Sequence, residues 1–256
     1  MLKYLDIIWA VKGCFHPDGY AVAIPRVYKG RKVKKMEEAL QLVRQKLPFL
    51  LKYVEEIGFE VPLVPLKESE ILDPFSKTVE DEIAKEFMKY FKKVGITGSM
   101  LYSNSHADMD FLSFNEEDYQ TLVNLRKKGI TQPLKVINRN EVEVLNERDF
   151  LYLKENRVIE GVFNGEPYTF KIVKCEDFGV VEGKEKFEGI VEIVKAEKPY
   201  SIPVKYYTNK GFYLTSFRIR FTELKEGMKL YVNGILLKRN KFLDLDLDLA
   251  KEVKIL

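Results

Sequence analysis

The segment from Gly95 to Phe114, GITGSMLYSNSHADMDFLSF, contains the features that decide the fold. Residues 94–97 are a short apolar run that leads into Gly98-Ser99, and a second run continues over residues 110–114. Short runs of this kind predict two β-strands, with the glycine and the serine in a tight turn after the first strand. Both strands are expected in a mixed sheet at the centre of the chain.

Two acids, Asp108 and Asp110, stand at the start of the second strand. Alternate residues of a strand point to the same side, so both carboxylates should face one pocket while Met109 and Phe111 face the core. Two hard anionic ligands suit Mg²⁺ or Mn²⁺. The glycine of the preceding turn leaves backbone N–H groups open to phosphate oxygens, and the serine adds a hydroxyl donor. The segment therefore predicts a site for a metal ion and a nucleoside triphosphate.

This pattern resembles the signature of the polymerase-beta-like nucleotidyltransferase superfamily, in which a strand, a Gly-Ser pair and an Asp-x-Asp strand follow one another. A wider resemblance is to archaeal predicted nucleotidyltransferases, through His16-Pro17, Pro25-Arg26 and the stretch SFRIRF at residues 216–221. The resemblance implies transfer of a nucleotidyl group from a nucleoside triphosphate to a hydroxyl acceptor. It assigns the metal to Asp108 and Asp110 and the phosphates to Gly98 and Ser99. The acceptor, whether a nucleic-acid end, a protein or a small molecule, stays open.

The sequence departs from this family in one respect, because active members place a third carboxylate on a later strand. The best candidate strand, residues 168–172, offers Thr169 and Lys171 on the alternation that faces the pocket. Glu166 at the preceding turn and Glu160 on the partner strand are the remaining candidates for the third metal ligand. A second hypothesis is therefore a catalytically silent nucleic-acid-binding protein that retains the nucleotidyltransferase fold.

Periodicity and turn residues predict an α+β protein with three parts. Residues 1–75 are expected to hold a hairpin (6–15 and 20–28), a helical segment over residues 36–57 that Pro48 kinks or divides, and an extended, proline-containing connection over residues 60–73. Residues 76–175 form the nucleotidyltransferase-like core, with a helix between 140 and 155 and a closing hairpin over 158–173. Residues 176–256 contain short β-rich runs (187–195, 200–207, 212–221 and 228–238), which predict a small β-barrel, with an OB-like form as one candidate.

The C-terminal part interleaves cations with aromatic rings, and this pattern suits single-stranded RNA or DNA. Lys205, Tyr207, Arg218 and Arg220 are the candidate nucleic-acid contacts, and the two arginines are expected on one face of a strand. An aromatic core that alternates with solvated charges is the alternative interpretation.

Three further features have plain explanations. The basic run over residues 26–35 is expected to be a solvated loop rather than a phosphate track. The alternating acids of residues 244–248 are expected to form a charged strand edge that discourages pairing, rather than a second metal site. His16 and His106 are each expected in an exposed loop.

Composition limits the remaining possibilities. The chain of 256 residues has 42 basic and 39 acidic residues, so its net charge of +3 identifies no partner and any nucleic-acid surface must come from local clustering. Cys14 and Cys175 belong to no zinc-type pattern and are expected to be two reduced thiols. The apolar runs are far shorter than the roughly 20 residues that cross a bilayer. We expect a cytoplasmic protein whose Lys- and Glu-rich composition is typical of heat adaptation, and the oligomeric state stays open.

Overall fold

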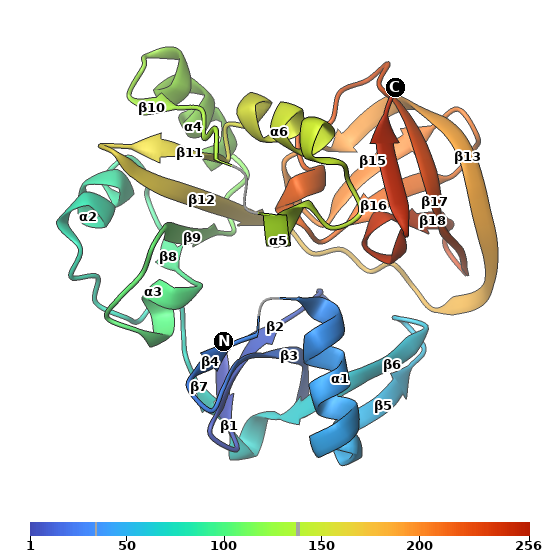
Figure 1. Cartoon of the computed structure of the whole chain (residues 1–256), viewed down its shortest axis with the longest axis horizontal. Helices are drawn as coiled ribbons and strands as arrows, with labels where there is room; N and C mark the ends of the chain where they lie inside the picture. The colour runs from blue at the N-terminus through green and yellow to red at the C-terminus, as the bar shows by residue number, and fades with distance from the viewer. Residues whose placement is uncertain (34, 137–138) are drawn as a thin grey trace.

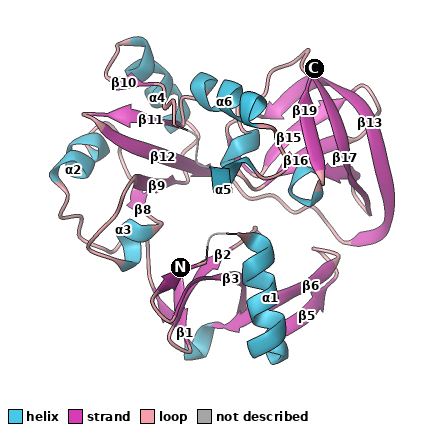
Figure 2. Ribbon diagram, viewed as in Figure 1, coloured by secondary structure: helices cyan, strands magenta, loops and turns pink. Residues whose placement is uncertain are grey.

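The computed structural model describes residues 1–33, 35–136 and 139–256, which form a mixed α+β fold with three sheets (Figure 1). We call them the N-terminal, central and C-terminal sheets. Figure 2 shows that the strands fall into these three groups, with the helices lying beside them. The expected α+β class is confirmed, and the three parts of the chain meet near the middle of the view in Figure 1.

The N-terminal sheet has the strand order β5-β6-β3-β2-β1-β7, with β4 paired to β3. Its strands are β1 (Leu2–Tyr4), β2 (Ile7–Val11), β3 (Tyr20–Tyr28), β4 (Arg31–Lys32), β5 (Leu51–Val54), β6 (Phe59–Pro65) and β7 (Glu70–Ile71). The antiparallel pair of β2 and β3 confirms the expected hairpin. Helix α1 (Met36–Lys46) packs Val43 into a core that contains Trp9 and Val64.

Two predictions for this region are right only in part. The helical segment expected over residues 36–57 is divided at Pro48, but only its first part is an α-helix, because α1 ends at Lys46 and a single 3₁₀ turn, η1 (Pro48–Leu50), leads into β5. Proline cannot continue a helix, and short apolar runs satisfy helical and strand spacing equally well. Residues 60–73 are extended as expected, but they are no mere connection, because β6 pairs with both β3 and β5.

The central sheet has the order β10-β11-β12-β9-β8, with β14 paired to β12. Its strands are β8 (Gly95–Ile96), β9 (Met109–Ser113), β10 (Thr131–Gln132), β11 (Glu160–Phe163), β12 (Glu166–Val173) and β14 (Ser201–Ile202), and its helices are α2 (Glu82–Met88), α3 (Ser99–Tyr102) and α4 (Asp118–Lys127). The ring of Phe87 on α2 lies 5.1 Å from that of Phe111 and 4.8 Å from that of Tyr168. This aromatic core fixes the inner face of β9 and β12, and with it the direction of their outer face.

The C-terminal sheet consists of β13 (Val181–Lys198), β15 (Val204–Thr208), β16 (Tyr213–Ser216), β17 (Lys229–Arg239), β18 (Leu243–Asp246) and β19 (Glu252–Ile255), with two 3₁₀ turns, η3 (Ile219–Phe221) and η4 (Leu247–Leu249). The region between residues 140 and 155 was expected to form one helix, but it forms two, α5 (Arg139–Val142) and α6 (Glu147–Asn156). Glu143, between them, has a φ of 46°, which no continuous helix allows. Phe150 and Leu153 of α6 pack with the core of the C-terminal sheet.

The acids of residues 244–248 do not form an exposed strand edge, because β18 lies between β16 and β17. Asp244 is fully buried and pairs with Arg239 at 2.6 Å. Asp246 accepts a hydrogen bond from the backbone N–H of Asp248, and Asp248 accepts one from the backbone N–H of Phe217, each at 2.8 Å. The acids therefore hold the interior of this sheet together.

The two cysteines are not the reduced thiols that their spacing predicted. Cys14 and Cys175 form a disulfide across 161 residues of sequence, with their Cα atoms 5.5 Å apart. The bond joins the turn between β2 and β3 to the segment that follows β12. The two cysteines occur far apart in sequence, so only the three-dimensional arrangement of the N-terminal and central sheets brings them together.

The C-terminal sheet is tied to the other two by polar contacts. Arg239 donates a hydrogen bond of 2.7 Å to the carbonyl of Glu56 in the N-terminal part. Glu223 accepts hydrogen bonds from the hydroxyl of Tyr119 at 2.8 Å and from the backbone N–H of Val158 at 3.0 Å, both in the central part. The helices are too short or too polar to cross a membrane: among the residues that the structure describes, none is both long enough and apolar enough to do so.

Candidate functional site

The Gly-Ser turn of the quoted segment leads directly from β8 to the side of β9. The two strands pair antiparallel, with Ile96 opposite Phe111, and the N–H of Thr97 donates a hydrogen bond of 2.9 Å to the carbonyl of Asp110. The next residue, Gly98, therefore lies beside the Asp110 side chain.

Gly98 is in direct contact with the Asp110 carboxylate. Its φ of 60° and ψ of −144° belong to a region that only glycine populates freely. A Cβ atom built on Gly98 would lie 2.8 Å from Cγ of Asp110 and would overlap its Oδ2 atom. Any other residue here would displace the carboxylate, so the turn and the acid form one site.

The alternation expected for β9 is present. Met109 and Phe111 are almost completely buried, and Asp108 and Asp110 lie on the opposite side of the chain, partly exposed to water. The backbone N–H of Asp110 donates to the sulfur of Met100 at 3.3 Å, which links β9 to α3. Burial raises the pKa of Asp108, and the neighbouring Asp110 charge raises it further. A cation beside the two acids would favour the ionised form of Asp108 and so lower this pKa.

Ser99 begins the four-residue helix α3 and is mostly buried. The ammonium of Lys77 donates to the carbonyl oxygens of Met100 at 2.8 Å and Leu101 at 3.2 Å. These bonds satisfy carbonyls at the end of α3, where the helix itself offers no partner. The Gly-Ser turn is therefore held between β8 on one side and a capped helical turn on the other.

Lys171 occupies the position where the third carboxylate was sought. The parallel pairing of β9 and β12 puts Thr169 opposite Asp110, and Lys171 follows on the same alternation. Its Nζ atom lies 3.2 Å from Oδ1 of Asp110. The site thus combines two acids with one lysine, a pairing that sequence reasoning did not foresee, although Lys171 had been placed on the pocket-facing side.

The other candidates for a third metal ligand lie elsewhere. Glu166 is exposed at the start of β12 and shares the alternation of the buried Tyr168, away from Asp110. Glu160 is buried and pairs with Arg157 at 3.1 Å. Among the described residues, no three His, Cys, Asp or Glu side chains are grouped as a metal site. The charge of Glu141 also raises the pKa of Asp108, but this glutamate pairs with Lys154 at 3.1 Å and belongs to no such group.

Cations of the N-terminal sheet also act on the site. Lys32 opposes the rise in the pKa of Asp108. Burial raises the pKa of Tyr102, which the charge of Arg26 lowers and that of Asp110 raises. The basic run over residues 26–35, interpreted from the sequence as a solvated loop, therefore contains two residues whose charges act on Asp108 or on Tyr102, and Lys34 of that run lies outside the described residues.

The two histidines have structural partners. Nε2 of His106 lies 3.4 Å from Oδ2 of Asp81, the residue that caps α2, so His106 fixes the loop before β9. Nδ1 of His16 accepts a hydrogen bond of 3.1 Å from the N–H of Val22. Burial lowers the pKa of His16. Both side chains are partly buried rather than free in exposed loops.

The candidate nucleic-acid contacts of the C-terminal part are mostly engaged within the protein. Arg218 and Arg220 both pair with Glu143, and Arg220 lies in the turn η3 rather than on a strand. Lys205 pairs with Glu176 at 2.8 Å and lies over the rings of Tyr213 and Phe242. Tyr207 is 37% exposed. The expected common strand face of the two arginines is therefore absent.

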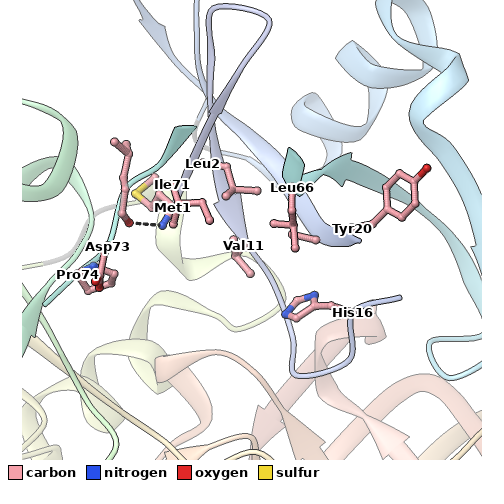
Figure 3. Close-up of a pocket in the computed structure, with 11 residues that line it drawn as sticks. Met1, Leu2, Val11, His16, Tyr20, Leu66, Ile71, Asp73 and Pro74 are labelled. Carbon is pink, nitrogen blue, oxygen red and sulfur yellow. Dashed lines mark hydrogen bonds between the residues drawn. The ribbon is translucent and has the colours of Figure 1, made fainter. Parts of the chain in front are cut away.

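A separate hollow of about 300 Å³ lies on the N-terminal sheet (Figure 3). Figure 3 shows Leu2, Val11 and Leu66 around it, with the His16 ring at its lower edge. The Met1 ammonium at its other side donates to the carbonyl of Leu72 at 3.0 Å. The hollow is mainly apolar and shares no lining residue with the paired acids.

Comparison of the chain with protein-family models, with curated proteins and with solved structures finds no match. The functional conclusion therefore depends on the geometry of the site itself.

Proposed function

We propose that this protein is a member of the polymerase-beta-like nucleotidyltransferase superfamily and transfers a nucleotidyl group from a nucleoside triphosphate to a hydroxyl acceptor. The observation that carries the proposal is the contact between Gly98 and the Asp110 carboxylate. A tight glycine turn against paired acids suits a triphosphate whose phosphates meet backbone N–H groups and whose metal meets carboxylates.

The residues present fit a divalent cation in part. Asp108 and Asp110 would hold Mg²⁺ or Mn²⁺. Burial, and after it the charge of Asp110, raises the pKa of Asp108, and a cation bound there would favour the ionised carboxylate. When bound, the metal would neutralise charge on the phosphates during transfer. The protein's own contribution is to orient the triphosphate at Gly98 and Ser99 and to keep both acids on one face of β9.

The second candidate is a catalytically silent nucleic-acid-binding protein with the same fold. The 3.2 Å ion pair between Lys171 and Asp110 favours it, because the lysine already neutralises one of the two acids. A lysine in place of a third carboxylate also removes a ligand from the metal that would activate the acceptor.

For the C-terminal sheet we propose a small closed barrel of the OB type. The support is the pairing of strands, which passes from β13 through β15, β16, β18 and β17 and returns to β13. The pair of β16 and β18 is parallel and the other four are antiparallel. Small barrels of this type bind oligonucleotides in many proteins, which suits a nucleic acid as the acceptor or partner.

A cytoplasmic location is proposed together with heat adaptation. Disulfides are rare in the cytosol of ordinary organisms, but intracellular proteins of hyperthermophiles are rich in them. The Cys14–Cys175 bond and the Lys- and Glu-rich composition are compatible with the same origin.

The decisive experiment is a calorimetric titration of Mg²⁺ and each nucleoside triphosphate into the wild type, Asp108→Asn and Asp110→Asn. We expect metal-dependent nucleotide binding that weakens about tenfold or more in both variants, because each loses an anionic ligand. Glu60→Gln, a change at an exposed acid of β6, is the matched control and should bind like the wild type.

The outcomes separate the two candidates. Nucleotide binding that is equal in the wild type and both Asp variants overturns the enzymatic proposal. Salt-sensitive RNA or DNA binding that all four proteins share, without metal-dependent nucleotide binding, supports the silent protein. Release of pyrophosphate on addition of candidate acceptors then tests turnover.

A further inference from the structure

Lys171 and Gly98 each approach one oxygen of the same carboxylate. Nζ of Lys171 lies 3.2 Å from Oδ1 of Asp110, and a Cβ atom built on Gly98 would overlap the other oxygen, Oδ2. A lysine of β12 and the turn that follows β8 thus meet at one acid of β9. A ligand that binds at this turn and at Asp110 therefore comes next to the Lys171 ammonium.

The Lys171 ammonium has capacity for a second partner. Among the residues that the structure describes, Asp110 is its one partner in a hydrogen bond or an ion pair. An ammonium carries three N–H donors, so the bond to Asp110 leaves donors for another acceptor. The side chain of Lys171 is 33% exposed and that of Asp110 is 16% exposed, so a ligand from solution reaches the lysine more easily than the acid.

Asp108 lacks a cation of its own. It is partly exposed on the same side of the chain as Asp110, and within the described part of the chain no hydrogen bond or ion pair joins its carboxylate to another residue. Two acids and one lysine leave one net negative charge, which is half of what neutralises a divalent cation. A free divalent ion must therefore compete with Lys171 for Asp110.

We propose that Lys171 makes the site selective for a metal–phosphate complex over the free metal ion. A divalent ion bound by Asp108 and Asp110 drives the ammonium away from Oδ1, because two cations beside one oxygen repel each other. The phosphate oxygens of a nucleoside triphosphate that arrives with its metal give the released ammonium a charge-assisted acceptor. A free ion brings no such acceptor and leaves the lysine without a counter-ion.

This role of Lys171 rests on the proposed function for the identity of the ligand. It also gives the ion pair of Lys171 and Asp110 a use in an active protein, because the same lysine that neutralises the acid in the empty site binds phosphate in the occupied one. Gly98 and Lys171 approach one carboxylate, so a phosphate at the glycine turn is within reach of the lysine.

The test compares free Mn²⁺ with Mn²⁺ premixed with an equal amount of inorganic tripolyphosphate. Calorimetry measures both with the wild type, Lys171→Met, Lys171→Arg and the control Lys52→Met, which changes an exposed lysine of β5. We expect the wild type to bind the complex about tenfold or more tightly than the free ion. Lys171→Met should bind the free ion about tenfold more tightly than the wild type does, and the complex less tightly.

The two control variants should keep the preference for the complex, since Lys171→Arg retains the charge and Lys52→Met lies elsewhere. Thermal unfolding shows that each variant is folded. Equal binding of the free ion by the wild type and Lys171→Met, absence of binding by both included, overturns the role of Lys171. An equal gain of Lys171→Met for the free ion and for the complex also overturns it, because the lysine would then only block Asp110.

Failure of this role and failure of the proposed function are distinguishable. The comparison of free and complexed Mn²⁺ contains no nucleoside, so a preference that depends on Lys171 stands even where nucleoside triphosphates do not bind, and then only nucleotidyl transfer fails. Metal-dependent nucleotide binding that needs Asp108 and Asp110, together with a preference that Lys171→Met leaves unchanged, retains the proposed function and refutes the role of Lys171.

Discussion

Reduction of the Cys14–Cys175 disulfide should destabilise the protein strongly. A cross-link restricts the unfolded chain more when it closes a longer loop, and this bond spans 161 residues. For a loop of that length, the chain-entropy relation gives a loss of about 5 kcal/mol at 25 °C on reduction. In a protein of this size that corresponds to a fall in the unfolding midpoint of about 10–20 °C.

The measurement is thermal and denaturant unfolding, followed by circular dichroism, with and without reductant. Alkylation of the unfolded, unreduced protein should modify neither Cys14 nor Cys175. The control is Cys14→Ser/Cys175→Ser, which should unfold like the reduced wild type and should not respond to the reductant. If the oxidised and reduced wild type unfold at the same temperature, or if both thiols react before reduction, the reasoning about this bond is refuted.

Two further predictions concern particular contacts. Gly98→Ala should lower the free energy of unfolding by about 3 kcal/mol or more, because the new side chain strains the backbone and overlaps the Asp110 carboxylate. Gly165→Ala is the control, because Gly165 has a φ of 86° but open space around it, so only the backbone strain remains and urea unfolding should show a loss of about 1 kcal/mol. Arg239→Met leaves Asp244 buried without its cation, and the same measurement should show a loss of about 3–5 kcal/mol.

Local sequence patterns predicted the parts of the site that depend on neighbours in the chain. The alternation around Asp108 and Asp110 needs only the geometry of one strand, and the turn at Gly98 needs only the absence of a side chain. Both are present. The hairpin of β2 and β3 was predictable for the same reason, since its turn residues lie between two apolar runs.

The features that sequence patterns missed depend on pairing between distant segments. Lys171 meets Asp110 only because β9 and β12 are parallel and in a particular register, which no local pattern fixes. The disulfide requires two sheets to be placed against each other. The buried pair of Asp244 and Arg239 was interpreted as a solvated edge because alternating acids look the same in sequence whether or not a cation lies opposite them.

The candidate site depends on how the sheets are placed against one another, because its acids and Lys171 lie on the central sheet while Lys32, whose charge acts on Asp108, lies on the N-terminal sheet. The Cys14–Cys175 disulfide ties the N-terminal part to the central part, and the hydrogen bond from Arg239 to the Glu56 carbonyl ties the C-terminal sheet to the N-terminal part. Glu223 joins the C-terminal part to the central part. Each of these ties connects residues that are far apart in sequence, so the arrangement of the three sheets is set by contacts that no local pattern predicts.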